Sequence, residues 1–476
     1  MDETMEPVRL IHERKKANGQ WPVSTGRIED MKAARYWVMI LIVFVPAAAW
    51  AQLSLPGVGP GLGLPDRTVG EASSKIIDPI TGSLEADLLD RLSRSELTAL
   101  LDRLRMDRTS RFLRDNRAHV ERDENGDPAV RGILVATDIS EASVSKAVAS
   151  GFTVFERGRI DGLDLNFVKF STRKGESLKS EQKKLQKIAR EAEISGDNIY
   201  FTSATPSSCG GCGALPAALL AGGAAKTATI GLIDGGVARH GLIKIPVEQR
   251  GFAKGAPLAS AHGTAIASLI SMSRKDSGTG LLAADIYGSD PAGGNATAIA
   301  RALGWMATRK IPVVTISLVG PDNGLLRRAI RSAQGKGMLI VAAVGNDGPA
   351  APPRFPAAYK GVLGVTGVDR RHKALPEAGI ATPVDFAAPG ADIMGASPDG
   401  KTVPLRGTSY AAPLVAARLA AHYPAPDIAA IEKAVSALIG EAGILAKRAR
   451  TRSMAMVWSA KIAPTDKYSD FLRGTD

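Results

Sequence analysis

A serine, a histidine, an aspartate and an asparagine stand in this sequence where their surroundings favour chemistry. Ser409 lies in the run GTSYAAP, in which a tight turn leads into a helix of small residues. A serine hydroxyl is a weak nucleophile until a base accepts its proton, and that base needs an acceptor that fixes its tautomer. His262 in AHGT and Asp234 in IGLIDGG can fill these two positions, and Asn346 in VGNDG offers an amide donor for an oxyanion. The four side chains therefore predict nucleophilic attack on a carbonyl group.

The order of these residues along the chain narrows the class of enzyme. Aspartate, then histidine, then serine is the order of the subtilisin-like triad. An esterase or lipase should instead carry its serine in GxSxG, ahead of the acid and the histidine. The motifs around the four residues resemble those of the subtilase family, and the resemblance covers residues 230 to about 420. Three further runs resemble connections of that family (355–359, 362–369 and 385–390).

The resemblance implies a role for each motif. Asp234, His262 and Ser409 would form the catalytic triad, with their side chains within hydrogen-bonding reach at the edge of one sheet. The side-chain amide of Asn346 and the backbone N–H of Ser409 would bind the tetrahedral oxygen. His240 is a rival base, but it follows Asp234 so closely that reaching Ser409 across its own loop would be awkward. A glycine follows Asp234 where the family usually has serine or threonine, so one local hydrogen bond is missing.

The same resemblance assigns substrate binding to two further segments. Ser317, Leu318 and Val319 would pair with an extended peptide by main-chain hydrogen bonds. Val344 and Gly345 would form the floor of the pocket for the residue at the cleavage site. Val319 stands where the family has glycine, which would narrow the edge of that pocket. Because no carboxylate in these segments is placed to hold lysine or arginine, we expect a non-basic residue at the cleavage site.

Strands and helices alternate over residues 227–425, the region expected to form the catalytic domain. Strands are expected up to Asp234 and near 283–287, 313–318 and 338–344, and helices after His262 and at 295–308 and 325–334. This alternation predicts an α/β fold with a mainly parallel sheet and helices on both faces, as in subtilisin-like proteins. Sites in such sheets form beyond the carboxyl ends of the strands, where Asp234, Ser317 and Asn346 are expected.

Residues 130–205 show a different pattern, in the order βαββαβ of a ferredoxin-like α+β module. The expected strands are 131–139, 152–156, 165–171 and 198–202, and the expected helices are 140–150 and 177–192. Similar modules precede the catalytic domain of many subtilases as propeptides, which assist folding and then block the cleft as intramolecular inhibitors. A small domain without that role is the alternative. Residues 206–226 are expected to be an exposed Gly/Ala linker, and proteolysis concentrates in such segments.

The N-terminal part carries a processing signal. In residues 31–51, Lys32 and Arg35 precede a short apolar run and an Ala-Trp-Ala site, the pattern of a secretory signal peptide. The run falls short of the ~20 residues that a spanning helix needs, so membrane contact is expected only through an uncleaved signal segment. We therefore expect an exported protein, periplasmic or secreted. The remaining regions are interpreted as a non-native or disordered extension (1–30), a linker and charged helical region (52–129), and a C-terminal helix with a basic tail (426–476).

The two cysteines, Cys209 and Cys212, stand in one Cys-Gly-Gly-Cys run. In an exported chain this run favours a small disulfide ring over a structural zinc site, which needs four ligands. A redox-active pair is the third alternative, without a strand-to-helix context to support it. No cofactor is required for the expected chemistry. The resemblance allows structural calcium, but no acidic ligand cluster stands out and no metal ligand is assigned.

Composition sets limits on partners. Sixty Lys and Arg residues against 48 Asp and Glu give a net charge of +12, which favours anionic surfaces and acidic substrates. The basic residues are dispersed and no nucleic-acid-binding motif is present, so nucleic acid is not expected as a partner. The sequence thus predicts an exported serine endopeptidase acting on proteins or peptides, made as a self-processing zymogen. A catalytically silent subtilase-like protein for binding or folding assistance is the alternative.

Overall fold

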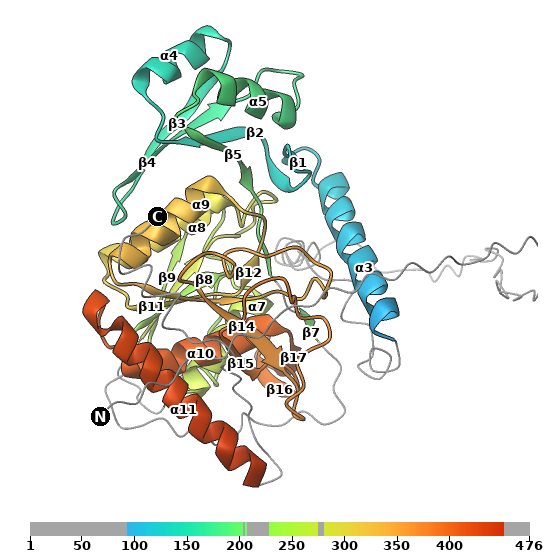
Figure 1. Ribbon diagram of the computed structural model, residues 1–476, viewed down its shortest axis with the longest axis vertical. Coiled ribbons are helices and arrows are strands. Elements are labelled where there is room, and N and C mark those ends of the chain that lie inside the picture. Colours follow the sequence, from blue (N-terminus) through green and yellow to red (C-terminus); the bar gives the residue numbers. More distant parts are fainter. Residues whose placement is uncertain (1–92, 203–204, 207–227, 275–279, 452–476) are drawn as a thin grey trace, which may run out of the picture. The chain divides into compact units, whose positions relative to one another are not determined.

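The computed structural model describes residues 93–202, 205–206, 228–274 and 280–451 (Figure 1). The chain divides into two units, Met1–Leu64 and Pro65–Asp476, and every described residue belongs to the second. The predicted signal peptide and the Cys209–Cys212 disulfide lie outside the described residues. Among the helices that are described, none combines the length and the apolar character needed to cross a membrane.

A seven-stranded parallel sheet forms the centre of the C-terminal region, which confirms the predicted fold class. Its strands carry near-continuous apolar runs that are buried on both faces, as parallel sheets require. All six neighbouring pairs are parallel. The order across the sheet is β15 (Phe386–Pro389), β14 (Leu363–Val368), β13 (Leu339–Ala343), β11 (Val313–Ile316), β8 (Ile230–Asp234), β10 (Leu281–Asp285) and β9 (Val247–Gly251).

Helices cover both faces of this sheet (Figure 1). One face packs in a single apolar cluster against α7 (Ala261–Met272), α10 (Thr408–His422) and α11 (Ile431–Thr451). The other face packs against α8 (Ala296–Thr308) and α9 (Gly324–Gly335). Asn295 and Asn323 cap α8 and α9, and a short 3-10 turn, η1 (Ile428–Ala430), precedes α11. The helical layers fix the positions of the turns at the carboxyl edge of the sheet.

The preceding module has the predicted βαββαβ order. Its elements are β2 (Pro128–Thr137), α4 (Glu141–Ala149), β3 (Thr153–Ile160), β4 (Leu165–Ser171), α5 (Leu178–Ile188) and β5 (Glu193–Asn198). The antiparallel pairing order β5-β2-β4-β3 is ferredoxin-like, and β1 (Val120–Arg122) adds a short further pair to β2. Ser140 and Ser177 cap the two helices, which pack on one face of the sheet around Leu134 and Phe170.

The predicted last strand of the module, 198–202, is wrong, because the strand that closes the sheet is β5. Its sequence, EISGDN, has polar residues at alternate positions and so looks like a loop. Ile194 points into the core of the module, whereas the polar side chains of Glu193 and Asp197 bond to groups of the parallel-sheet region. The partners that allow these polar residues in a strand lie more than 90 positions away in the sequence.

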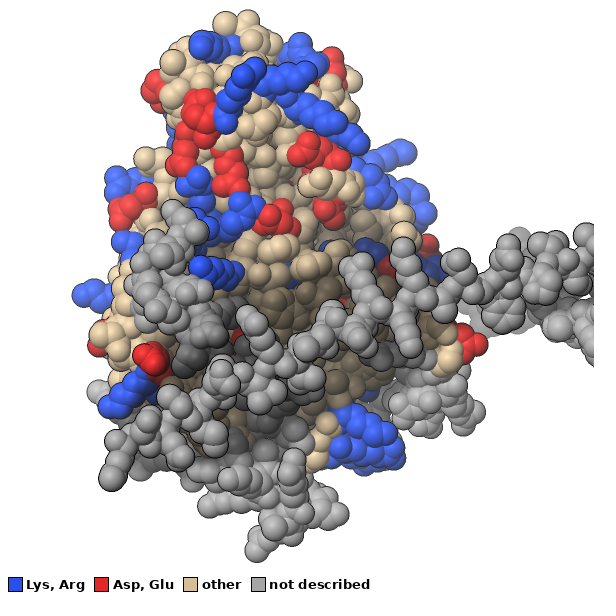
Figure 2. Space-filling view, in the orientation of Figure 1, with Lys and Arg blue, Asp and Glu red and all other residues tan. Residues whose placement is uncertain are grey.

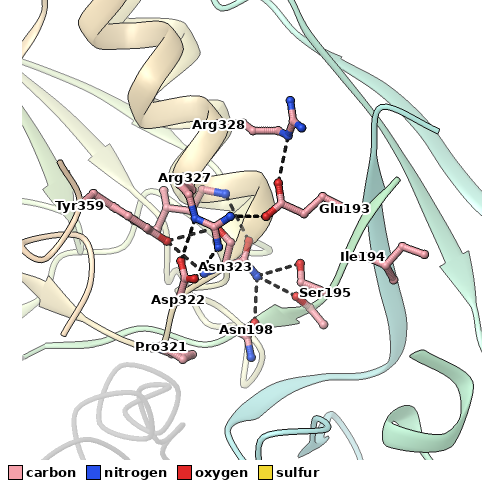
Figure 3. A network of polar contacts seen from close by, with 12 residues as sticks. Glu193, Ile194, Ser195, Asn198, Pro321, Asp322, Asn323, Arg327, Arg328 and Tyr359 are labelled. Atoms are coloured by element: carbon pink, nitrogen blue, oxygen red, sulfur yellow. Dashed lines mark hydrogen bonds and ion pairs between the residues drawn. The ribbon is translucent and has the colours of Figure 1, made fainter. Parts of the chain in front are cut away.

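The module packs on the helical layer of α8 and α9 with buried apolar side chains, among them Ile160 and Phe167, and polar contacts lie beside them (Figure 3). The Asn323 amide donates to the Gly196 carbonyl at 2.8 Å and to Asn198 Oδ1 at 2.9 Å. Glu193 pairs with Arg327 and Arg328 at the start of α9. Figure 2 shows basic and acidic side chains interspersed over the face in view. The interface therefore combines an apolar cluster with paired charges and amides at the N-terminal ends of helices.

One helix precedes the module. The helix α3 (Arg94–Asp115) begins with a capping box in which Ser93 and Glu96 bond to each other's backbone N–H groups. It falls within the region predicted to be charged and helical, and it packs by Phe112 against Val120, Ile199 and Phe201. It is therefore attached both to the module and to the segment that leaves the module.

Candidate active site

Asp234, His262 and Ser409 meet at the carboxyl edge of the parallel sheet. Asp234 is the last residue of β8, and His262 and Ser409 lie in the first turns of α7 and α10. Ser260 caps α7 by accepting from the Gly263 N–H at 2.9 Å. Asp234 and Ser409 are fully buried, whereas the side chain of His262 keeps a small exposed fraction of 10%. The histidine is thus the member of the group that solvent or a ligand reaches first.

The imidazole of His262 is held by the carboxylate of Asp234. Its Nδ1 lies 2.9 Å from Oδ1 and 2.8 Å from Oδ2 of that carboxylate, and Oδ1 also accepts from the Gly235 N–H at 2.7 Å. A proton on Nδ1 shared with the carboxylate leaves Nε2 with its lone pair. Within the described part of the chain, Nε2 is buried and has no hydrogen-bond partner. The Asp234 carboxylate therefore orients the imidazole ring.

Ser409 bonds across to the strand segment that follows β11. Its Oγ donates to the Ser317 carbonyl at 3.0 Å, and the Ser317 hydroxyl donates to the Ser409 carbonyl at 2.9 Å. The second bond is possible because Pro413, four residues later, has no N–H with which to occupy that carbonyl in the helix. Gly407, with φ of 140°, makes the turn that places the serine at the helix start.

The geometry differs from the sequence expectation at one point. We expected Ser409 and His262 to be linked directly, but the serine hydroxyl donates to Ser317 and the Nε2 of His262 is unoccupied. The imidazole nevertheless lies beside the start of α10, 5.6 Å, centroid to centroid, from the ring of Tyr410, which follows Ser409 in the chain. Catalytic hydrogen bonds are often long or misaligned until substrate binds, so this difference does not exclude a nucleophile–base pair.

Asn346 is oriented by the same helix start. Its Oδ1 accepts from the Thr408 N–H at 3.0 Å, and Thr408 Oγ1 in turn accepts from the Gly345 N–H at 3.1 Å. Since the oxygen of the amide is committed to Thr408, the NH₂ group is on the opposite side of the amide and can act as a donor. An oxyanion beside the first turn of α10 would also meet the positive end of the helix dipole.

One of the segments assigned to substrate binding is a strand that already pairs with another strand of the same chain. Leu318 and Val319 form β12 (Leu318–Val319), which pairs antiparallel with β6 (Phe201–Thr202). Farther along, β7 (Thr205–Pro206) pairs with β17 (Thr402–Arg406), which in turn pairs with β16 (Ile393–Ala396). Because β17 leads directly into Gly407, the segment leaving the module lies on either side of the turn that carries Ser409. The contribution of β17 was not predicted from the sequence.

A buried ion-pair group next to Asn346 was also missed. The carboxylate of Asp347 lies 2.5 Å from Arg108 of α3 and 2.7 Å from Arg354. Burial would raise the pKa of Asp347, but the neighbouring guanidinium groups of Arg108, Arg354 and Arg105 outweigh it and hold the pKa below its usual value. The signal in the sequence was an acidic residue directly after the amide, and its partners lie too far away in the sequence to be recognised.

The rival base His240 bonds elsewhere: it accepts from the Leu242 N–H at 3.0 Å, and its Nε2 lies 3.2 Å from the Lys401 carbonyl. Val344 and Gly345 follow β13 directly, and their assignment to the floor of a pocket stays a prediction. In the described ranges, no group of three or more His, Cys, Asp or Glu side chains could hold a metal ion.

Comparisons with known proteins identify the family of this chain. The model of the Subtilase family matches residues 225–443. Subtilisin Savinase from Lederbergia lenta is 30% identical over 200 residues, which are 39% of this chain and 72% of that protein. Minor extracellular protease Epr from Bacillus subtilis (strain 168) is 28% identical over 209 residues, 42% of this chain. The chain spans only 32% of the length of that relative. Among solved structures, fervidolysin from Fervidobacterium pennivorans has a TM-score of 0.53 at 15% identity and supports the fold, over 73% of this chain and 61% of that one.

Proposed function

Since the chain belongs to the subtilase family, we propose that it is a serine endopeptidase that hydrolyses peptide bonds through an acyl-enzyme at Ser409. The observation that carries this proposal is the buried Asp234–His262 pair beside the helix start that presents Ser409. Subtilase relatives that are named as proteases support the class of reaction.

In the proposed reaction, Ser409 Oγ attacks the carbonyl carbon of the substrate while His262 Nε2 accepts the hydroxyl proton. Asp234 keeps the imidazole in the required tautomer and stabilises its charged form. The Asn346 amide and the Ser409 N–H donate to the tetrahedral oxygen. His262 then returns the proton to the leaving amine, the peptide bond breaks, and water repeats the sequence on the acyl-enzyme to release the acid and restore the serine.

We also propose that the chain is made as a zymogen that cuts itself. The pairing of β6 with β12 and of β7 with β17 supports this, because it leads the chain past the turn of Ser409 in an extended form. The bond to be cut is expected between Thr202 and Thr205, just ahead of the segment 206–226 that was predicted to be exposed and cleavable. Until release, residues up to Thr202 would then act as an intramolecular inhibitor, the propeptide role that the module's fold suggests.

We also propose that the protein is exported. The signal-peptide pattern of residues 31–51 and the extracellular protease named among the relatives support export. The product would be periplasmic or secreted and would act on protein or peptide substrates. A pair of cysteines that closes a disulfide would be compatible with such a compartment.

Labelling with a fluorophosphonate tests the nucleophile directly. After self-cleavage and removal of the N-terminal segment, the native protein should take one label, and mass spectrometry should place it on Ser409. The Ser409→Ala variant and heat-denatured wild type are the matched controls and should remain unlabelled. If processed, folded wild type takes no label, the protein is better explained as a silent subtilase-like binding or folding-assistance protein.

Removal of the amide donor should slow turnover without removing the active site. Asn346→Ala is expected to lower kcat about 10²- to 10³-fold, because one donor to the developing oxyanion is lost. The measurement is steady-state hydrolysis of a peptide substrate by the processed protein. Asn346→Asp is the matched variant, since it keeps an acceptor for the Thr408 N–H but loses the NH₂ donor. Activity of both variants within threefold of wild type would remove Asn346 from the proposed oxyanion site.

A further inference from the structure

The slot between β12 and the segment 344–346 is already occupied on two sides by side chains. A Cβ added at Gly345 would lie 3.1 Å from Val319 Cγ1 and 3.7 Å from Arg354 Cγ. Gly345 has φ of 97° and its position admits no side chain without strain. The side chains of Val319 and Arg354 therefore border the space that a side chain at position 345 would need.

Arg354 is held firmly in this place. Its side chain is only 12% exposed, and its guanidinium pairs at 2.7 Å with the Asp347 carboxylate, which is 5% exposed. Its backbone N–H donates to Thr382 Oγ1 at 2.9 Å. Moving the guanidinium out of the slot would leave the buried carboxylate of Asp347 without that partner, which is strongly unfavourable. The arginine thus reduces the space beside Gly345, and its charge is paired with the Asp347 carboxylate, which Arg108 also contacts.

The register of the chain shows which substrate residue meets this slot. Phe201 pairs with Val319 and Thr202 with Leu318, while Thr205 pairs with Arg406 on the other side of the Ser409 turn. An extended peptide in the same register would therefore have its acyl side, N-terminal to the cut bond, along β12 and next to Gly345. The slot is the site for the side chain of the residue whose carbonyl is attacked.

We propose that Val319, Arg354 and Asp347 restrict cleavage to bonds that follow a small, uncharged residue, such as alanine, serine or glycine. This inference rests on the proposed endopeptidase activity and specifies its substrates. The branched side chain of Val319 narrows the entrance, and Arg354 fills the base. A larger substrate side chain would have to displace a well-packed valine or break a buried ion pair.

The charged groups that border the slot also disfavour charged side chains of the substrate. A lysine or arginine of the substrate would meet the guanidinium groups of Arg354 and Arg108, and a glutamate would have to compete with the Asp347 carboxylate for them. A buried charge without a partner is unfavourable in either case. The chain's own sequence between the two paired strands agrees with the restriction, because its two residues, Ser203 and Ala204, are both small.

The test uses the processed protein and a series of peptides that differ only in the residue on the acyl side. The ratio of kcat/KM for alanine over leucine or phenylalanine should be at least about tenfold, and the lysine and glutamate peptides should be poorer than alanine. Ratios within one protein sample do not depend on the fraction that is folded. The comparison is therefore valid for variants of reduced stability.

Three variants separate volume from charge. Arg354→Gly should raise the leucine-to-alanine ratio at least tenfold by opening the base, and Val319→Gly should raise it independently by widening the entrance. Asp347→Asn leaves Arg354 without its carboxylate partner and should raise the glutamate-to-alanine ratio. This last variant tests the ion pair without enlarging the slot.

The outcomes distinguish the inference from the proposal on which it rests. Wild type that cleaves after phenylalanine or leucine as fast as after alanine would overturn the size restriction while leaving the endopeptidase in place. An unchanged leucine-to-alanine ratio in both Arg354→Gly and Val319→Gly would also overturn it. Wild type that cleaves none of the peptides and takes no fluorophosphonate label would instead refute the proposed function, and the inference with it.

Discussion

Replacing Ser409 by alanine is expected to lower kcat about 10⁶-fold and to leave the chain as an uncut precursor. The variant removes the only atom that can form the proposed acyl-enzyme, while the fold should be retained because alanine fits the small-residue start of α10. The readouts are peptide hydrolysis and the mass of the purified protein. Wild type expressed in the same way should show a new N-terminus between Thr202 and Thr205.

The precursor result needs a control for other proteases. Ser289→Ala removes the hydroxyl of a loop serine remote from the proposed triad, and this variant should be processed like wild type. Adding a trace of active wild type to the Ser409→Ala precursor then tests cleavage between molecules. If the pure Ser409→Ala protein is trimmed as efficiently as wild type, maturation depends on another protease and the self-processing proposal is wrong.

The second large effect is expected at His262. His262→Ala should reduce kcat about 10⁶-fold, similar to the loss at the serine, because nucleophile and base act as one unit. His240→Ala should remain within a few-fold of wild type, since its imidazole bonds only to the backbone of Leu242 and Lys401. Single-turnover hydrolysis by both variants, with circular dichroism to verify folding, makes the comparison.

The pair of histidine variants can contradict the assignment clearly. A large loss in His240→Ala with near-normal turnover in His262→Ala would exchange their roles and leave the Asp234–His262 contact as a structural bond. The double variant His262→Ala, Ser409→Ala should be no slower than either single variant. An additive further loss would mean that the two residues act in separate steps.

Much of the scaffold could be predicted because its signals are local. The buried apolar runs that end at Asp234, Ser317 and Asn346 identify parallel strands, and their carboxyl ends must meet at one edge. Caps such as Ser140 and Ser177 also depend only on neighbouring residues. Consequently the fold class and the contact between Asp234 and His262 followed from the sequence pattern and the family resemblance, whereas the bond expected between His262 and Ser409 is not present.

Features that depend on distant partners could not be predicted in this way. The strand β5 was missed because its polar residues are satisfied by α8 and α9. The Asp347–Arg354 pair and the contact with Arg108 join residues that have no characteristic spacing. The orientation of the Ser409 hydroxyl depends on the Ser317 carbonyl, 92 positions away, rather than on its own motif.

The proline in helix α10 affects how firmly the nucleophile is positioned. Because Pro413 offers no amide hydrogen, the Ser409 carbonyl is anchored to the hydroxyl of Ser317 at the edge of the sheet. The start of the helix and the central strand therefore move as one rigid piece, and thermal fraying of the first helical turn is suppressed where it would displace the reactive oxygen. The helical hydrogen bond that Pro413 cannot make is thus replaced by a bond to the sheet, which restricts the motion of Ser409.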